Sequence, residues 1–190
     1  MKSKTTKKLK DIAYLKRGYN IITRNLYDDN GDYFLVNLGN IDDFGDVVYD
    51  GLKRITIPEN KLKNFKEKYL LEKDDILLTL RGRAGKTAFI KENVDKLTVS
   101  YNFLIIKVKN TEEILVKYLF YYLRKEKNVN RIRDLSTKKI IDVVSTKDIE
   151  NFEITYPDIE TQKKYVDEIE KTKKEYFEAK EKYERLIKEI

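Results

Sequence analysis

The stretch Ile149-Glu150-Asn151-Phe152-Glu153-Ile154-Thr155-Tyr156-Pro157-Asp158-Ile159-Glu160-Thr161-Gln162 decides the fold. Aromatic and β-branched residues over Phe152–Tyr156 are typical of a strand. Proline ends this strand, and neither glycine nor proline occurs again in the sequence. The acidic residues just after the proline suit the first turn of a helix, where the macrodipole favours negative charge. The sequence therefore predicts a globular domain over 1–157 and a long helix over 158–190.

The predicted helix carries an apolar stripe at a 3-4 spacing. Ten positions follow this spacing, and seven of them are apolar: Ile159, Val166, Ile169, Tyr176, Tyr183, Ile187 and Ile190. Gln162, Lys173 and Lys180 interrupt the stripe. A helix of about 32 residues is roughly 48 Å long. Because so long and thin a stripe is not stable alone, we expect these seven residues to form a dimer and partner surface. The alternative is a helix folded back on its own domain.

The first 157 residues alternate between strand and helix patterns. Strands are expected over 33–38, 47–49, 54–57, 76–80, 87–90 and 99–108, and a short helix or strand over 9–15 is stopped by Gly18. Helices are expected from Pro58 to about Tyr69 and from a Thr111 cap to about Arg124, with a short turn or helix over 145–149. The fold class is therefore α+β, a mixed twisted-sheet domain followed by a long C-terminal coiled-coil helix.

Composition excludes much of the usual catalytic chemistry. The chain has no cysteine and no histidine, so disulfides, Cys/His zinc sites and Ser-His-Asp or Cys-His catalysis are absent. Apolar runs such as Phe103–Ile106 are far shorter than the roughly 20 residues that span a bilayer. The basic N-terminus leads into no apolar segment, so we expect no secretory signal and a cytoplasmic location.

The net charge of +7 is unevenly distributed. Ten acidic and nine basic residues follow Pro157, which leaves 23 acidic and 31 basic residues before it. A basic domain favours a nucleic-acid partner, because cations neutralise phosphates and release counterions. The alternative is a lysine-rich composition without any anionic partner, as AT-rich genomes encode.

Two motifs that resemble catalytic sites do not fit. Gly85-Lys86-Thr87 lacks the first glycine of a phosphate-binding P-loop, because Leu80 stands at that position. The run Arg81–Lys86 is instead either a plain hairpin turn or a basic loop for phosphates and guanine edges. Pro157-Asp158-Ile159-Glu160 opens a helix rather than a metal-binding strand edge, so no metal site and no catalytic residue is expected.

Four stretches together resemble the specificity subunits of type I restriction–modification systems. In order along the chain they are Leu9–Gly18; Leu71–Leu78 running on to Gly82 and Gly85; Tyr101–Lys107; and Ile149–Pro157 with Glu160, Gln162 and Val166. The last stretch matches the family's junction of strand, proline, E-x-Q and long helix, and is the most specific of the four. Asp74 departs from the glycine that the family usually has before its Asp-Ile-Leu.

The resemblance implies a non-catalytic target-recognition domain over 1–157 that reads a few base pairs of double-stranded DNA. In this family two such units follow in tandem, and their helices pair as an antiparallel coiled coil between two half-sites. That coiled coil docks methyltransferase subunits, which bring S-adenosylmethionine, and a restriction subunit can join. This chain carries one unit, so it is either a half-subunit that forms a homodimer or a fragment. We expect no cofactor of its own.

The candidate DNA-binding residues are cations and polar side chains near the predicted turns. The first group is Arg81, Arg83 and Lys86, and the second is Arg24, Asn25, Lys53, Arg54, Tyr101, Asn102, Arg131, Arg133, Lys138 and Lys139. The segment 131–139 is expected to be either a groove-facing loop or a solvated connector. The competing classes are a protein–protein adaptor with an incidental basic face, the recognition part of a fused restriction or methylation enzyme, and a stand-alone nuclease or methyltransferase.

Overall fold

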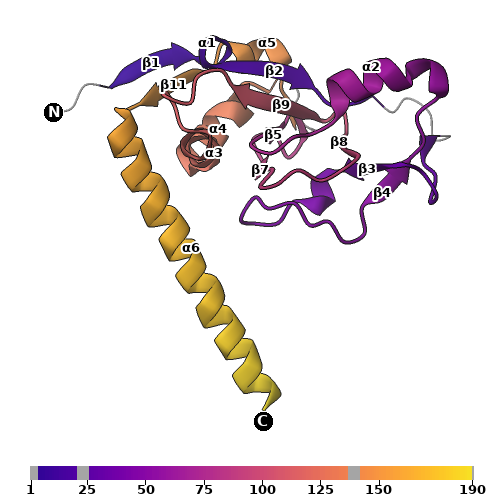
Figure 1. The fold of residues 1–190 in the computed structure, drawn as a ribbon. Coiled ribbons are helices and arrows are strands. Elements are labelled where there is room, and N and C mark those ends of the chain that lie inside the picture. Colours follow the sequence, from indigo (N-terminus) through magenta and orange to yellow (C-terminus); the bar gives the residue numbers. More distant parts are fainter. Residues whose placement is uncertain (1–3, 21–25, 137–141, 190) are drawn as a thin grey trace.

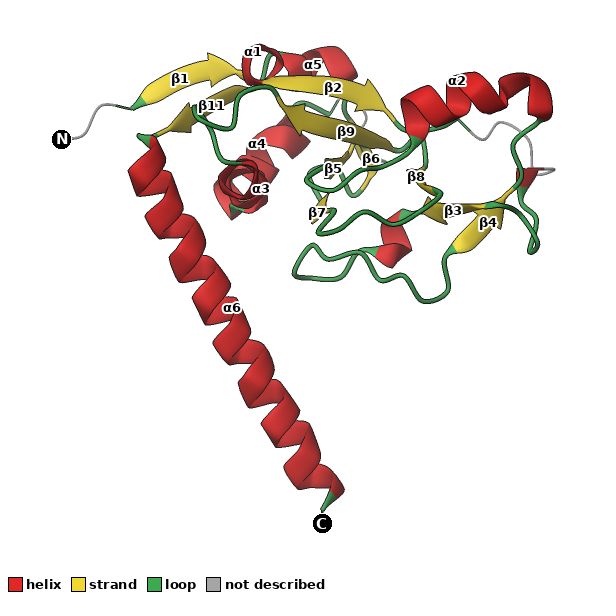
Figure 2. Ribbon diagram, viewed as in Figure 1, coloured by secondary structure: helices red, strands yellow, loops and turns green. Residues whose placement is uncertain are grey.

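A four-stranded and a three-stranded sheet pack face to face, helices cover their outer sides, and one long helix leaves the domain (Figure 1). The structure is a computed structural model that describes residues 4–20, 26–136 and 142–189. The predicted α+β class, with mixed twisted sheets and a long C-terminal helix, is confirmed (Figure 2).

The strands are β1 (Thr5–Lys8), β2 (Ala13–Arg17), β3 (Tyr33–Val36), β4 (Lys53–Ile55), β5 (Ile76–Thr79), β6 (Arg81–Gly82), β7 (Thr87–Phe89), β8 (Leu97–Val99), β9 (Phe103–Val108), β10 (Asp142–Val143) and β11 (Glu153–Tyr156). The helices are α1 (Leu9–Ile12), α2 (Glu59–Tyr69), α3 (Val116–Arg124), α4 (Glu126–Asp134), α5 (Thr146–Glu150) and α6 (Ile159–Lys188), with a 3-10 turn, η2, over Leu38–Asn40.

The four-stranded sheet has the order β2-β9-β5-β7 and is antiparallel throughout. Its central strand β9 opens on the continuous apolar run Phe103–Ile106, as expected of a strand buried on both faces. One face packs against α1, α3, α4 and α5, and the other packs against the three-stranded sheet. The predicted hairpin between β5 and β7 is confirmed by its antiparallel register.

The three-stranded sheet has the order β4-β3-β8, with β3 parallel to β8. Its far face packs on α2 through Phe65, which is fully buried together with Leu35 and Ile55. Helix α2 begins directly after Pro58 and ends at Tyr69, as predicted. Two outer strands, β1 and β11, pair with each other beside the start of α6.

Three sequence predictions are corrected. The single strand expected over 99–108 is two strands of different sheets, because the N–H of Phe103 bonds back to Ser100 and turns the chain. Helix α3 begins at Val116 rather than after Thr111. The segment expected as a loop from Arg131 is helical up to Asp134, because α4 buries Asn128 and Ile132 against the domain. Residues 137–141 lie outside the described part of the chain.

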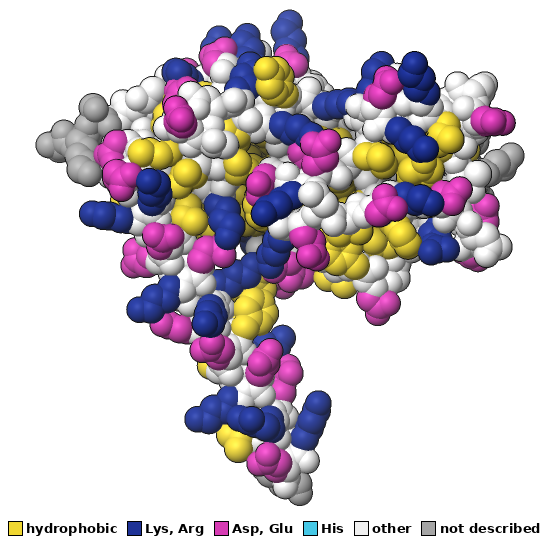
Figure 3. Space-filling view, in the orientation of Figure 1, with side chains coloured by type: hydrophobic (Ala, Val, Ile, Leu, Met, Phe, Trp, Pro, Cys, Tyr) yellow, Lys and Arg dark blue, Asp and Glu magenta, His cyan; other side chains and the backbone are white. Residues whose placement is uncertain are grey.

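Helix α6 has 30 residues and projects as an arm beyond the domain (Figure 3). Asp158 caps its N-terminus by accepting the N–H of Thr161. Among the described residues, no helix is long and apolar enough to cross a bilayer.

Candidate nucleic-acid interface

The segments that carry Arg17, Arg81, Tyr101 and Asn102 lie together where the strands of the four-stranded sheet begin or end. Arg17 ends β2 opposite Leu104, and Thr79 ends β5 opposite Phe103, so both strands finish where β9 begins. The N–H of Leu80 donates to the carbonyl of Asn102 at 2.8 Å, which holds the two connections together. We call the surface formed by Arg17, Arg81, Tyr101 and Asn102 the recognition edge.

The guanidinium of Arg17 lies over an aromatic ring at this edge. Its guanidinium carbon is 4.1 Å from the centroid of the Tyr101 ring, which is 44% exposed. Its Nη1 is buried and has no hydrogen-bond partner among the residues that the structure describes. The guanidinium is thus held over a ring with no acidic partner among the described residues, and its remaining N–H groups are the ones that an anion or a base edge could bind.

Gly18 explains how this arrangement is held. A Cβ on Gly18 would lie 2.3 Å from the carbonyl oxygen of Ser100, so only glycine allows the two backbones to approach. The approach brings the end of β2 beside the turn that carries Tyr101 and Asn102, both of which are exposed. The sequence does not predict Arg17 as a site residue, because no local pattern shows that β2 ends next to Tyr101. The one sequence signal at this position is the glycine that follows Arg17.

The hairpin turn carries the first group of predicted residues. Gly82 and Gly85 adopt positive φ of 90° and 88°, as expected for glycines in a tight turn. Arg81 and Arg83 are exposed, and within the described residues their guanidiniums make no hydrogen bond. Lys86 differs, because its ammonium is half-buried and donates to the carbonyl of Ile41 at 2.5 Å. Arg81 and Arg83 are therefore the available cations of the turn.

The other predicted cations lie on different elements. Lys53 and Arg54 are exposed on the edge strand β4, above the rings of Tyr27 and Phe34 at 5.3 Å and 4.7 Å. Arg131 and Arg133 lie on α4 and bond the carbonyls of Glu153 and Ala84 at 3.4 Å and 3.2 Å. Arg24, Asn25, Lys138 and Lys139 are outside the described residues. The structure thus brings Arg81, Tyr101 and Asn102 together and places the rest elsewhere or does not describe them.

Lysines also gather around Lys16, which precedes Arg17 on β2. Burial lowers the pKa of Lys16, the neighbouring charges of Lys68 on α2 and Lys107 on β9 lower it further, and the charge of Asp75 raises it. Lys107 is paired with Glu72 at 2.6 Å and lies 3.6 Å from Asp75. Acidic groups therefore offset part of the positive charge around Lys16, and this cluster is not counted as part of the recognition edge.

The predicted stripe on α6 is divided between two faces. Val166 is buried against its own domain and Ile159 is half-buried, whereas Ile169, Tyr176, Tyr183 and Ile187 are 38–65% exposed. Ile190 lies outside the described residues. Tyr165, Thr172, Ala179 and Leu186 are exposed as well, and with Ile169, Tyr176 and Tyr183 they form a 3-4 series without a charged residue. This series, Tyr165, Ile169, Thr172, Tyr176, Ala179, Tyr183 and Leu186, is here called the exposed stripe.

Known proteins resemble this chain in family and in fold. The family model described as type I restriction modification DNA specificity domain matches residues 1–188. The S subunit of a type I restriction–modification system from M. genitalium aligns with a TM-score of 0.63 at 17% identity, covering 89% of this chain and 38% of that one. No curated protein sequence matches the chain.

Two further solved structures share the fold. A chain from a study of complex assembly and conformational transition of the type I R-M system aligns with a TM-score of 0.66 at 14% identity, covering 90% of this chain and 38% of that one. The type IIG restriction endonuclease BpuSI aligns with a TM-score of 0.56 at 13% identity, covering 87% of this chain and 26% of that one. The chain thus spans well under half the length of these proteins.

Proposed function

The chain belongs to the family of type I restriction modification DNA specificity domains, and from this premise we propose that it recognises a specific sequence in double-stranded DNA. The observation that carries the proposal is the recognition edge, where Arg17 and Arg81 lie beside the exposed Tyr101-Asn102 turn. Arginine can bind guanine or phosphate through two parallel hydrogen bonds, and asparagine can do the same with adenine. Stacking on Tyr101 reduces the entropy that Arg17 loses on binding.

The chemistry of modification is assigned to partner subunits. Methyltransferase subunits would bring S-adenosylmethionine, a restriction subunit could join them, and this chain would supply only the target. Two observations support a non-catalytic role: the sequence has neither cysteine nor histidine, and no group of three carboxylates in the described ranges could hold a metal ion.

A homodimer would complete the site, because one recognition edge reads only one half of a bipartite target. The exposed stripe of α6 supports this proposal, since Tyr183 and Leu186 are 65% and 50% exposed on an isolated chain. Pairing with a second copy would bury them and place two recognition edges about a two-fold axis. Such a dimer favours a palindromic bipartite sequence.

The decisive experiment is selection of bound duplexes from a randomised pool by the isolated chain, followed by affinity measurements across a salt series. Enrichment of one motif, with affinity that falls steeply as salt rises, is the expected result. Binding without sequence preference, or without salt dependence, would contradict the proposal. The second outcome would favour a protein–protein adaptor with an incidental basic face.

One observation favours a second candidate, the recognition part of a fused restriction or methylation enzyme. The chain resembles about a quarter of a type IIG endonuclease in fold. Cleavage and methyl-transfer assays on the isolated chain with its selected duplex, with and without added methyltransferase subunit, separate the two. A recognition subunit should show activity only when the partner is added.

A further inference from the structure

Helix α6 is attached to its own domain by two different elements. The first is α3 and the segment before it, which contact α6 from Gln162 to Glu170: Gln162 is fully buried, and Glu170 accepts hydrogen bonds from Tyr121 and, at 3.0 Å, from Lys117. The second is the loop Ile41–Val47, called the 41–47 loop, which contacts α6 from Lys173 to Phe177. Every residue from Glu178 to Glu189 is exposed.

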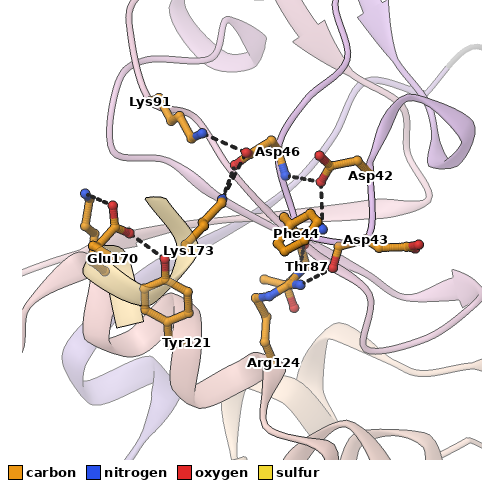
Figure 4. Close-up of polar contacts among 11 residues, drawn as sticks. Asp42, Asp43, Phe44, Asp46, Thr87, Lys91, Tyr121, Arg124, Glu170 and Lys173 are labelled. Carbon is orange, nitrogen blue, oxygen red and sulfur yellow. Dashed lines mark hydrogen bonds and ion pairs between the residues drawn. The ribbon is translucent and has the colours of Figure 1, made fainter. Parts of the chain in front are cut away.

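The 41–47 loop binds α6 through one ring and one carboxylate (Figure 4). The ring centroid of Phe44 lies 5.2 Å from that of Tyr176 and 4.8 Å from that of Phe177. The carboxylate of Asp46 lies 2.9 Å from the ammonium of Lys173, whose side chain is only 13% exposed. Lys91 approaches the same carboxylate at 2.7 Å. Apolar packing and a largely buried ion pair therefore act at the same point on the helix.

Hydrogen bonds within the loop and from α3 hold it in place. The Oδ1 of Asp42 accepts the N–H groups of Phe44 and Asp46, both at 2.8 Å. Arg124 of α3 donates to the carbonyls of Asp43 and Thr87 at 2.6 Å and 3.0 Å, as Figure 4 shows. These bonds present Phe44 and Asp46 to α6 in one orientation.

The base of the same loop reaches the hairpin that carries Arg81 and Arg83. The ammonium of Lys86, at the end of that hairpin turn, donates to the carbonyl of Ile41 at 2.5 Å. The base of this short loop thus contacts the hairpin that carries Arg81 and Arg83, and its tip contacts the middle of α6. If the hairpin or α6 moved relative to the other, the loop would have to move as well.

We propose that Phe44 and Asp46 are positioning residues that fix the direction of α6 relative to the recognition edge. Contacts with α3 alone run along one side of the helix and leave it free to swing away from the domain. From the last α3 contact at Glu170, about 27 Å of helix remain, so a tilt of about 10° would move its far end by about 5 Å. In the proposed dimer that displacement changes the separation of the two half-sites, so this second consequence rests on the proposed function.

The direction of α6 can be measured without DNA, because the chain has no cysteine and accepts site-specific spin labels. Lys66→Cys on α2 and Glu181→Cys on α6 change two exposed residues, one on the domain and one on the arm. Labelled chain diluted in unlabelled chain reports the distance within one copy by pulsed electron paramagnetic resonance. We expect one narrow distance peak, and loss of that peak in Phe44→Ala and Asp46→Asn. An unchanged narrow peak in both variants would overturn the proposal.

Two further variants guard against effects of misfolding. Lys173→Met removes the ion pair from the helix side without altering the loop, and should also broaden the peak. Lys171→Met is the matched control, because Lys171 is 79% exposed and, within the described ranges, pairs only along the helix with Glu175 at 3.9 Å; its peak should stay narrow. Broadening in the control equal to that in Lys173→Met would contradict the assignment.

A second readout tests the consequence for DNA. Duplexes that carry two copies of the selected motif at varied separations should bind wild-type dimer best at one separation. Phe44→Ala should lose that preference while its affinity for a single motif stays the same. A retained preference would contradict the role in spacing. Failure of the wild type to select any motif would overturn the proposed function and leave the distance measurement valid.

Discussion

The Oε1 of Gln162 accepts the N–H of Leu115 at 2.9 Å, across the junction between α6 and the start of α3. The Nε2 of the same fully buried side chain donates to the carbonyls of Glu113 and Pro157 at 3.0 Å and 2.9 Å. One fully buried amide thus satisfies three backbone groups. This explains why α3 begins at Val116: the preceding N–H is already bonded to a side chain 47 positions away.

Gln162→Leu should destabilise the domain strongly. The substitution removes the partner of one N–H and two carbonyl groups that lie against a fully buried side chain, and an unpaired buried group costs about 1–3 kcal/mol. Because the junction can relax in part, we expect the free energy of unfolding to fall by roughly 2–4 kcal/mol in total, as measured by urea unfolding. The neighbouring exposed residue provides the control, because Lys164→Leu should change the stability by less than about 0.5 kcal/mol. Equal effects of the two changes would show that the amide is not essential to the junction.

The same junction shows how far the sequence predicts this helix. The strand, the proline and the start of α6 follow from local patterns, and all three were correctly placed. The face that meets the domain could not be predicted. Gln162 and Lys173 interrupt the predicted stripe, yet both point to the domain, and the partner of Lys173, Asp46, is 127 positions away. From the sequence alone, a polar residue on a helix is predicted to be exposed to solvent unless its distant partner is known.

The exposed stripe leads to a prediction about the oligomeric state of the chain. Tyr183→Lys combined with Leu186→Lys should convert the proposed dimer into a monomer, because two charges would have to be desolvated in a helix interface. Glu181→Lys is a matched control that adds positive charge on the opposite side of α6. Sedimentation velocity of the three proteins at equal concentration gives the answer. A wild-type chain that is monomeric at concentrations well above those used for DNA binding would exclude the homodimer.

The recognition edge leads to a prediction about salt. Arg17→Gln and Arg81→Gln should each weaken duplex binding, and each should lower the slope of log affinity against log salt by about 1 if the arginine contacts a phosphate. If the arginine reads a base instead, the free energy of binding should weaken by about 1–3 kcal/mol for the selected motif and by much less for random duplex. Lys171→Gln removes the same charge from the exposed arm and should change neither quantity. Unaltered binding by both arginine variants would refute the assignment of this edge.

The sequence predicts Arg81 as a DNA-binding residue but not Arg17. Arg81 lies in a glycine-rich turn between two strong strand patterns, which predicts an exposed cation. Arg17 lies at the end of β2, and its relation to Tyr101 depends on the pairing of β2 with β9, about 90 residues later. Lys86 lies in the same turn as Arg81, but its ammonium donates a hydrogen bond to the carbonyl of Ile41. Local sequence therefore identifies the turn, whereas tertiary pairing decides which of its cations stay available.

Asp75 leads to a prediction about pH. Its side chain is only 2% exposed, and burial raises its pKa to about 6 despite a hydrogen bond from the N–H of Glu72 and the charge of Lys107 at 3.6 Å. The folded protein therefore binds this proton more tightly than the unfolded chain, whose value is 3.8. The favourable contribution to stability is complete below the unfolded pKa and is lost as the pH rises through about 6.

Asp75→Asn isolates this contribution from that of other carboxyl groups. Asparagine can still accept the N–H of Glu72, but it does not ionise. One pKa unit corresponds to about 1.4 kcal/mol, and part of the effect is already lost at pH 4, so wild type should lose roughly 2.4 kcal/mol relative to Asp75→Asn between pH 4 and pH 7. The difference between the two proteins is the quantity to measure, by urea unfolding at several pH values, because groups such as Asp46 have a lowered pKa and act in the opposite direction. A difference that is constant over this range would mean that Lys107 stabilises the ionised carboxylate enough to cancel the cost of its burial.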